Sequence, residues 1–177
     1  MMRNLSKTIK EWGISLIIAL ALVYLIFTFI AQPVKVPTGS MEPTVMTDDL
    51  LIMEKVTRWW RPYEFGDILV FYHDPDNLGG DLYLKRLIGL PGDTIEVRDG
   101  KLIRNGEPVV EPYLNSLLMN GTFGPVTVPE GHYFFMGDNR NLSHDSRRWV
   151  NPFVPIDQVK GRAFFRYMPL TRFGLIE

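Results

Sequence analysis

The chain has 177 residues, with 19 Lys and Arg against 20 Asp and Glu, and it contains no cysteine. A formal net charge of −1 provides no basic field that would attract nucleic acid, so no nucleic-acid partner is expected. The absence of cysteine excludes disulfide bonds, a thiol nucleophile and thiolate zinc ligands. This length allows one folded domain with a substantial core and attached segments.

A long apolar segment covers residues 13–31, GISLIIALALVYLIFTFIA, and it contains no charged residue. A helix of this length rises about 1.5 Å per residue and spans about 30 Å, the thickness of a bilayer core. A cleavable signal peptide has a shorter apolar region, of about 7–15 residues, and ends in a small-x-small site. Here the segment ends in Phe29-Ile30-Ala31, with a bulky residue at a position where a small one is needed. The sequence therefore predicts a retained transmembrane helix.

The charges at the two ends of this segment are unequal. Three basic residues and one acidic residue precede it: Arg3, Lys7, Lys10 and Glu11. Only Lys35 follows closely. By the positive-inside rule, residues 1–12 are expected in the cytoplasm and residues 32–177 on the extracytoplasmic side of the plasma (inner) membrane. The chain is thus predicted to cross the membrane once, with the lipid bilayer as a partner.

After residue 32 the pattern changes to short β-branched and aromatic runs separated by turn residues. The best strand candidates are Leu50–Val56, Asp67–Tyr72, Thr94–Arg98, Tyr133–Met136 and Arg162–Tyr167. Asp99-Gly100 and Asn105-Gly106 each predict a tight hairpin turn. No amphipathic helix is expected here, although Ile156–Val159 can form one turn. The predicted fold class is mainly β, with a sheet that is closed or sandwiched to protect its edges.

The segment Arg58-Trp59-Trp60-Arg61 has two interpretations. Both tryptophans can be half buried in a β core. Alternatively, they are exposed beside the anchor, where their rings enter the lipid headgroups and the arginines meet phosphate. The nearby anchor favours the second interpretation, but the sequence does not decide between them.

The segment Pro37–Thr44 presents Ser40 on a turn. Gly39 lets the backbone bend sharply before the serine, and a proline on each side fixes φ. Taken alone, such a cluster is typical of an ordinary surface turn. Ser40 follows Ala31 by nine residues, so even an extended chain keeps it within about 30 Å of the bilayer.

A serine nucleophile needs a base. The three histidines are His73, His132 and His144. None lies in a triad-like motif and their spacing matches no familiar zinc site, so each is interpreted as structural or exposed.

Lys85 is the other candidate base, and it lies in the apolar segment Asp81–Asp93. Strand alternation places Tyr83, Lys85 and Leu87 on one face, with Leu82, Leu84 and Arg86 on the other. A desolvated lysine has a lowered pKa, and its neutral amine can take the serine proton near neutral pH. In the alternative interpretation the lysine stem lies on the core while the ammonium reaches water.

Residues 131–147, GHYFFMGDNRNLSHDSR, run from a strand into a polar loop. Asp145 and Arg147 can pair, and Asp138 and Asn139 can bond to backbone groups of the loop. Such a loop either orients a catalytic side chain or is only a well-capped turn.

Four motifs together resemble the type I signal peptidases, membrane-bound serine proteases that cleave signal peptides from exported proteins. The matches are PTGSMEPT at 37–44, FGDILVF at 65–71, YLKRLIGLPGD at 83–93 and GDNRNLSHDSR at 137–147. They occur in the family's order behind an N-terminal anchor, and with it they span most of residues 13–147. Any one motif is weak evidence, but four in order are highly specific.

The resemblance implies a Ser-Lys dyad, in which Ser40 is the nucleophile, Lys85 the general base and Ser143 the residue that orients the lysine amine. The implied oxyanion hole consists of the Ser40 N–H and the hydroxyl of Thr38, where many bacterial members carry serine. The implied structural supports of the site are Asp138, Arg140, Asp145 and Arg147. The implied lining of the shallow substrate pocket is Val36, Pro37, Met41, Val45, Tyr83 and Leu84.

The resemblance also implies a β-rich catalytic core with a small inserted β subdomain, at about 95–130 in this chain. The implied substrates are signal peptides of exported preproteins, cleaved after a small-x-small site, and the implied location is close to the translocation machinery. No cofactor and no metal ion are implied. Some members carry two transmembrane segments, whereas one is predicted here.

Other interpretations predict different behaviour. A soluble Ser-Lys autoprotease like the LexA-like repressors would not need the apolar segment. A specialised processing peptidase for one or few substrates fits the same motifs. A membrane-tethered β-domain that binds peptides without cleaving them would require Ser40 or Lys85 to be inert, and nothing in the sequence disables either.

Overall fold

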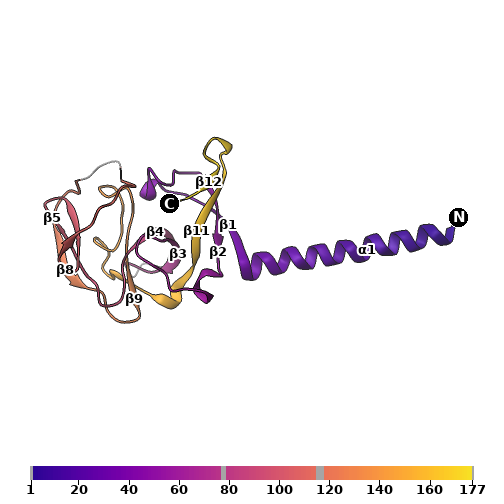
Figure 1. Cartoon of the computed structure of the whole chain (residues 1–177), viewed down its shortest axis with the longest axis horizontal. Helices are drawn as coiled ribbons and strands as arrows, with labels where there is room; N and C mark the ends of the chain where they lie inside the picture. The colour runs from indigo at the N-terminus through magenta and orange to yellow at the C-terminus, as the bar shows by residue number, and fades with distance from the viewer. Residues whose placement is uncertain (1, 77–78, 115–117, 177) are drawn as a thin grey trace.

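Helix α1 projects from a β-rich body in this computed structural model (Figure 1). The structure describes residues 2–76, 79–114 and 118–176, with residues 2–9 described by their backbone alone. The predicted cytoplasmic charges of Arg3 and Lys7 therefore lie outside the described side chains. Helix α1, Met2–Leu25, continues into a π-helical turn, Ile26–Ile30.

The projecting helix is long and apolar enough to cross a membrane over Lys10–Ile30, and none of this span is buried in the protein. Ala31, the last residue of the predicted segment, is already the first residue of strand β1. The helix thus passes into the β body without an intervening loop.

The main sheet has antiparallel strand pairs in the order β1-β2-β11-β3-β4-β9-β10, and β12 also pairs with β11. The strands are β1 (Ala31–Lys35), β2 (Leu50–Glu54), β3 (Ile68–His73), β4 (Asp81–Gly89), β9 (His132–Met136), β10 (Phe153–Pro155), β11 (Val159–Met168) and β12 (Gly174–Leu175). Strand β4 lies between β3 and β9, so both of its edges are paired.

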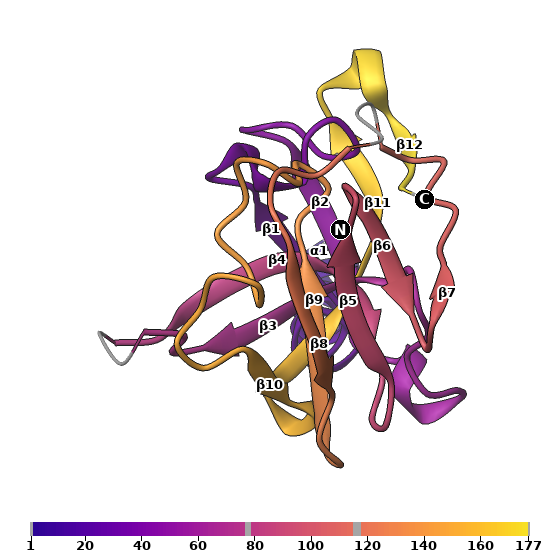
Figure 2. The same cartoon turned by 90° about the vertical axis from the view of Figure 1, so that its left-hand side faces the viewer.

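A second antiparallel sheet has the order β7-β6-β5-β8 and lies on the side of the body away from α1 (Figures 1 and 2). Its strands are β5 (Thr94–Arg98), β6 (Lys101–Arg104), β7 (Glu107–Pro108) and β8 (Phe123–Thr127). They occupy the interval of about 95–130 predicted for a small insert, of which 115–117 lie outside the described residues. Asp99 and Asn105 both have positive φ, 52° and 55°, as the two predicted hairpin turns require.

The two sheets share one of the apolar clusters of the body. Ile88 and Phe134 come from the main sheet, and Ile95, Val97 and Leu102 come from the second. All five side chains are nearly inaccessible to solvent. The second sheet is therefore packed onto the main sheet through a common core.

The five predicted strands are present, with ends that differ by a few residues. Strand β2 ends at Glu54, two residues before the predicted end at Val56. The Glu54 carboxylate accepts hydrogen bonds from the N–H groups of Val56 and Thr57, at 2.9 and 2.8 Å, and these bonds start a 3₁₀ turn over Thr57–Trp59. The single helical turn predicted after residue 155 is also present, at Ile156–Gln158.

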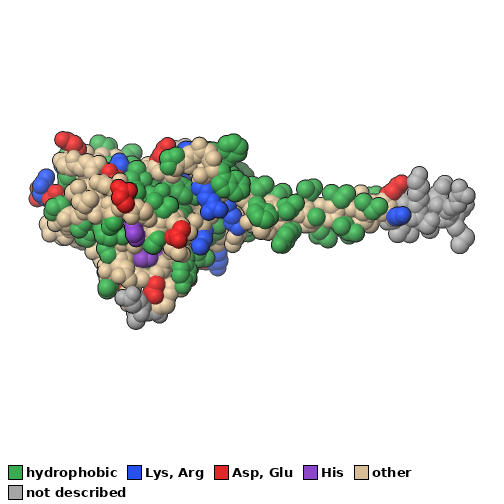
Figure 3. Space-filling view, turned by 90° about the horizontal axis from the view of Figure 1, so that it is seen from below, with side chains coloured by type: hydrophobic (Ala, Val, Ile, Leu, Met, Phe, Trp, Pro, Cys, Tyr) green, Lys and Arg blue, Asp and Glu red, His purple; other side chains and the backbone are tan. Residues whose placement is uncertain are grey.

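The two adjacent tryptophans are on the surface, 60% exposed at Trp59 and 83% at Trp60. Lys55, four residues before Trp59, is held at the end of the projecting helix. Its ammonium donates to the carbonyls of Phe27 and Thr28 at 3.1 and 3.2 Å, so the two tryptophans lie near that end. Figure 3 shows lysine and arginine side chains gathered where the helix joins the body. The interpretation in which the tryptophans are half buried in the core is therefore wrong.

Candidate active site

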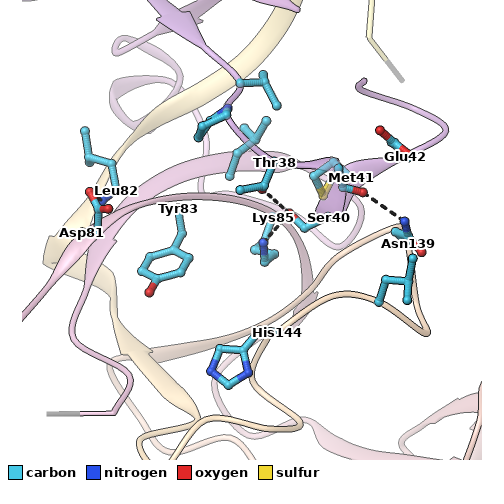
Figure 4. Close-up of a pocket in the computed structure, with 15 residues that line it drawn as sticks. Thr38, Ser40, Met41, Glu42, Asp81, Leu82, Tyr83, Lys85, Asn139 and His144 are labelled. Atoms are coloured by element: carbon cyan, nitrogen blue, oxygen red, sulfur yellow. Dashed lines mark hydrogen bonds between the residues drawn. The ribbon is translucent and has the colours of Figure 1, made fainter. Parts of the chain in front are cut away.

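Ser40 lies in a short 3₁₀ turn, Gly39–Met41, that follows the extended residue Thr38. The Met41 side chain is buried and fixes one side of the turn to the core. On the other side, the N–H of Asn139 donates to the Ser40 carbonyl at 3.1 Å, and the Asn139 side-chain amide donates to the Gly39 carbonyl at 3.1 Å. The turn is thus held from both sides, with the serine side chain facing a cavity (Figure 4).

Lys85 lies near the centre of β4 and is 4% exposed. Its Nζ is 2.6 Å from Ser40 Oγ (Figure 4). Burial lowers the pKa of Lys85 to about 8, although Asp145 and Asp138 act in the opposite direction. A substantial fraction of the amine is therefore neutral near pH 8, and the neutral amine can accept the serine proton across this contact.

The predicted alternation along β4 agrees with the packing of its apolar residues. Tyr83 and Leu87 pack into a cluster with Phe71 and Phe135. Leu84 packs against a different cluster, one that includes Met41. The interpretation of Lys85 as a surface lysine with a solvated ammonium is wrong, because its Nζ meets Ser40 in a nearly inaccessible position.

A cavity of about 480 Å³ surrounds the Ser40–Lys85 pair. Its lining comes from two segments, residues 36–42 and 81–85, and from three residues of the polar loop: Asn139, Leu142 and His144. Five of the six predicted pocket residues line it: Val36, Pro37, Met41, Tyr83 and Leu84. In Figure 4, Tyr83 and Leu82 lie on one side of the dyad, and Asn139 and Glu42 on the other.

Val45 is the exception among the predicted pocket residues. It is fully buried and packs with Val36 and Met41, behind the cavity wall. The Val45 N–H donates to the Met41 carbonyl at 2.9 Å, so the turn carries this residue inward. In this structure Val45 supports the pocket and does not line it.

Thr38 lies at the rim of the cavity. Its hydroxyl is 3.4 Å from Ser40 Oγ, a long contact on the exposed side of the nucleophile. Both Thr38 and Ser40 line the same cavity.

Ser143 is fully buried beside the nucleophile turn. A Cβ at Gly137 would lie 2.3 Å from both Ser143 Oγ and the Ser40 carbonyl, so the absence of a side chain at 137 allows the two serines to approach. Among the described residues, the Ser143 hydroxyl makes no hydrogen bond of regular geometry, although it lies close enough to Asp145 to help lower that pKa. The bond to Lys85 that the resemblance implies is therefore not formed in this structure.

The ion pair of Asp145 and Arg147, predicted from the sequence, holds the loop that carries Ser143. Arg147 donates to both carboxylate oxygens of Asp145, at 2.8 and 2.7 Å, and Gly137 N–H donates to the same group at 3.0 Å. Burial alone would raise the pKa of Asp145, but Arg147, the Gly137 N–H and Ser143 together outweigh it, and the net pKa is lowered. Arg147 also donates to the Arg140 carbonyl at 2.7 Å, which closes the loop on itself.

The other two predicted supports have partners that sequence analysis did not identify. Asp138 accepts two hydrogen bonds from the guanidinium of Arg86, at 2.8 and 2.7 Å, and one from the Thr44 hydroxyl at 2.6 Å. Arg140 pairs with both carboxylate oxygens of Glu111. One signal was available: an arginine in the middle of an apolar strand needs an acidic partner when that strand is buried.

The histidines have partners other than Ser40 in the described part of the chain. His73 bonds to the Asn151 carbonyl at 2.8 Å and His132 to the Glu130 carbonyl at 2.9 Å. His144 lines the cavity, but its Nε2 pairs with Asp76 at 2.9 Å. The geometry therefore favours lysine over histidine as the base for Ser40.

Known proteins resemble this chain over nearly its whole length. A family model described as signal peptidase, peptidase S26, matches residues 9–168. A probable signal peptidase I-1 from Synechocystis is 41% identical over 172 residues, which are 94% of this chain and 86% of that protein. A signal peptidase I from Bacillus licheniformis is 39% identical over 177 residues, covering 95% of this chain and 93% of its own.

Among solved structures, a signal peptidase I from Enterococcus faecalis V583 is 37% identical, with a TM-score of 0.48, and it covers 58% of this chain and 97% of that one. The family model covers most of this chain, and so do the relatives at about 40% identity. This chain belongs to the signal peptidase family, peptidase S26.

Proposed function

We propose that this chain is a membrane-anchored serine endopeptidase that removes signal peptides from exported preproteins, with Ser40 as nucleophile and Lys85 as general base. The observation that carries the proposal is the 2.6 Å contact between Lys85 Nζ and Ser40 Oγ inside a cavity, in a chain of the signal peptidase family. A buried lysine with a lowered pKa is the activation that a Ser-Lys pair needs.

The reaction proceeds in two proton-balanced steps. The neutral Lys85 amine takes the Ser40 proton while Oγ attacks the carbonyl carbon of the scissile peptide bond. The resulting ammonium then gives its proton to the leaving amine, and the acyl-enzyme remains. In the second step Lys85 takes a proton from water, the hydroxide attacks the ester, and the proton returns to Ser40 Oγ.

The proposed oxyanion hole has two donors, the N–H of Ser40 and the hydroxyl of Thr38. Each such donor contributes about 3–4 kcal/mol to stabilisation of the transition state. Threonine is restricted at χ1, so its hydroxyl has few positions to adopt once the backbone is fixed. The extended conformation of Thr38, with φ −134° and ψ 154°, supplies that fixed backbone.

The apolar lining of the cavity explains a preference for small side chains before the cleaved bond. Val36 and Met41 are buried and Leu84 packs against them, so the wall on this side of the serine cannot recede to admit a large group. Larger side chains are excluded sterically. We propose a cleavage site of the small-x-small type, as the resemblance to the family implies.

The proposed topology places residues 1–12 in the cytoplasm, residues 13–31 in the membrane and residues 32–177 on the extracytoplasmic side of the plasma (inner) membrane. The exposed Trp59 and Trp60 support a membrane interface at this end of the helix, since tryptophan favours that interface, and the orientation rests on the positive-inside rule. Preproteins emerge from the translocation machinery on that side, so we place the enzyme near it.

The deciding experiment is cleavage of a preprotein with an Ala-x-Ala site by the full chain in liposomes. Wild type, Ser40→Ala and Lys85→Met are compared, and circular dichroism establishes that each variant is folded. Cleavage by wild type alone is the expected result. Full activity of Lys85→Met would move the base elsewhere, and a folded wild type that cleaves no preprotein would overturn the proposal.

A further inference from the structure

A second group of buried charges lies behind the dyad. It consists of two arginines and two carboxylates: Arg86, Arg140, Glu111 and Asp138. Their side chains are between 0% and 6% exposed. The formal charges balance, and each arginine pairs with one of the carboxylates, as buried ions require.

Each arginine fixes one of two consecutive residues in the loop after β9. Arg140 Nε donates to the Gly137 carbonyl at 3.0 Å. Arg86 holds the next residue, Asp138, through both oxygens of its carboxylate. The two guanidinium groups together therefore set the position of the Gly137-Asp138 backbone.

This backbone segment is in direct contact with the nucleophile. Gly137 packs against the Ser40 carbonyl and the Ser143 side chain, with no room for a Cβ. The next residue, Asn139, donates hydrogen bonds to the carbonyls of Ser40 and Gly39 (Figure 4). A displacement of residues 137–139 would therefore move Ser40 relative to Lys85.

Both arginines are in turn held by one short segment outside the four motifs. Glu111 pairs with Arg140 through both carboxylate oxygens. The ring of Tyr113 lies under the Arg86 guanidinium, 3.7 Å from ring centroid to Cζ, and the Tyr113 hydroxyl donates to Glu111 at 2.7 Å. We name Glu111 and Tyr113 together the arginine clasp. They follow β7 of the second sheet and come from the interval predicted as a small insert.

We propose that Glu111 is a positioning residue for the Ser-Lys reaction, and that the arginine clasp makes the second-sheet segment a required part of the active site. The inference rests on the proposed function. It adds a role for a part of the chain to which the Ser-Lys chemistry assigns none.

Without the Glu111 carboxylate, Arg140 keeps a buried cation with no counter-charge, which is strongly unfavourable. The next carboxylate available is Asp138, already bonded to Arg86 and Thr44. Either Arg140 leaves the Gly137 carbonyl or Asp138 is drawn away from Arg86, and both changes move the loop that holds Ser40. A displacement of about 1 Å at reacting atoms can cost about 100-fold in rate.

The test compares Glu111→Gln with Glu107→Gln, which removes an exposed carboxylate from the same region. The full chain in liposomes cleaves a preprotein with an Ala-x-Ala site, and kcat and KM are measured well below the unfolding midpoint of each variant. Glu111→Gln is expected to lower kcat by about tenfold or more with KM changed less than about twofold, because substrate contacts are intact and only alignment is lost. Glu107→Gln is expected to match wild type.

Three further variants, two at Tyr113 and one at Glu111, remain informative if Glu111→Gln does not fold. Tyr113→Phe keeps the ring under Arg86 and should retain more of the kcat than Tyr113→Leu, which removes it. Glu111→Asp keeps the charge on a shorter side chain and should recover part of the kcat that Glu111→Gln loses.

A merely structural role for Glu111 gives a different result. Glu111→Gln would then unfold at a lower temperature, while its folded fraction kept the wild-type kcat, and this outcome would overturn the inference. Equal kcat for Tyr113→Phe and Tyr113→Leu would do the same for Tyr113. If wild type itself cleaved no preprotein, the proposed function would fail first, so the two failures are distinguishable.

Discussion

Lys85 and Arg86 are consecutive residues of β4, both almost fully buried, yet a carboxylate pairs with the arginine while a serine hydroxyl meets the lysine. The Asp138 carboxylate accepts both of its strong charge-assisted bonds from Arg86. The Asp145 carboxylate likewise accepts two hydrogen bonds from the Arg147 guanidinium. The negative charges of Asp138 and Asp145 are thus balanced by arginines. Burial therefore has the larger effect on Lys85 and lowers its pKa.

This arrangement predicts the pH dependence of cleavage. The pKa of Lys85 is lowered to about 8, and only the neutral amine can act as a base. The rate should therefore rise with pH and level off above about pH 8, because the inactive ammonium form predominates below that value. A profile of kcat/KM from acidic to alkaline pH checks this, and a midpoint near the ordinary lysine pKa would contradict it.

Removing the lysine should stabilise the protein while it abolishes activity. The pKa of Lys85 falls from 10.5 to about 8 on folding, so folding disfavours the ammonium. The resulting cost is complete below pH 8, shrinks as pH rises toward 10.5 and amounts to roughly 3 kcal/mol. Lys85→Met should therefore raise the unfolding midpoint at neutral pH by several degrees. The gain should shrink in alkaline buffer, and a variant that is less stable than wild type at pH 7 would refute this account.

Thr38→Val and Thr38→Ser form a matched pair for the oxyanion role. Valine keeps the shape of threonine and removes the hydroxyl, so kcat should fall by about 100-fold or more with KM nearly unchanged. Serine keeps the hydroxyl and should preserve most of the activity. Steady-state kinetics on both variants decide the matter, and equal rates for valine and threonine would remove Thr38 from the mechanism.

The exposed tryptophan pair should contact lipid. In liposomes containing brominated acyl chains, quenching of tryptophan fluorescence should decrease when Trp59 and Trp60 are both replaced by phenylalanine. Trp149 is a suitable internal control, because it is 5% exposed and packs against Phe71 and Tyr83. Replacing Trp149 alone should leave the lipid-dependent quenching in place. Unchanged quenching in the Trp59/Trp60 double variant would place that pair in water.

Local patterns were sufficient to predict most of the β structure. Alternation and turn residues located the five strands, and Asp99-Gly100 and Asn105-Gly106 defined two hairpin turns whose aspartate and asparagine have positive φ. The predicted strand ends were less accurate where a side chain bonds to the backbone and ends the strand. Glu54 does so at the end of β2, where its carboxylate accepts from the N–H groups of the following turn. The serine and lysine were identified by motif order, which single residues could not have achieved.

Tertiary contacts account for what the sequence did not reveal. Glu111 and Arg140 are 29 positions apart, and Arg86 and Asp138 are 52 apart, so no local pattern connects either pair. Val45 was assigned to the pocket by the resemblance to the family motifs, and an apolar residue at this position suits a cavity wall and a core equally well. The packing of the turn decides between the two, and it places Val45 inside the core.

The junction between α1 and β1 has a consequence for which bonds the enzyme can reach. The π-helical turn ends at Ile30, β1 starts at Ala31, and the Lys55 N–H donates to the Ile30 carbonyl at 2.8 Å while its ammonium bonds to the end of the helix. No flexible tether separates the proposed membrane span from the sheet that carries Lys85. In the proposed topology Ser40 therefore works at a constant height above the bilayer. We therefore expect the distance of the scissile bond from the lipid surface, as well as its flanking side chains, to determine where an emerging chain is cut.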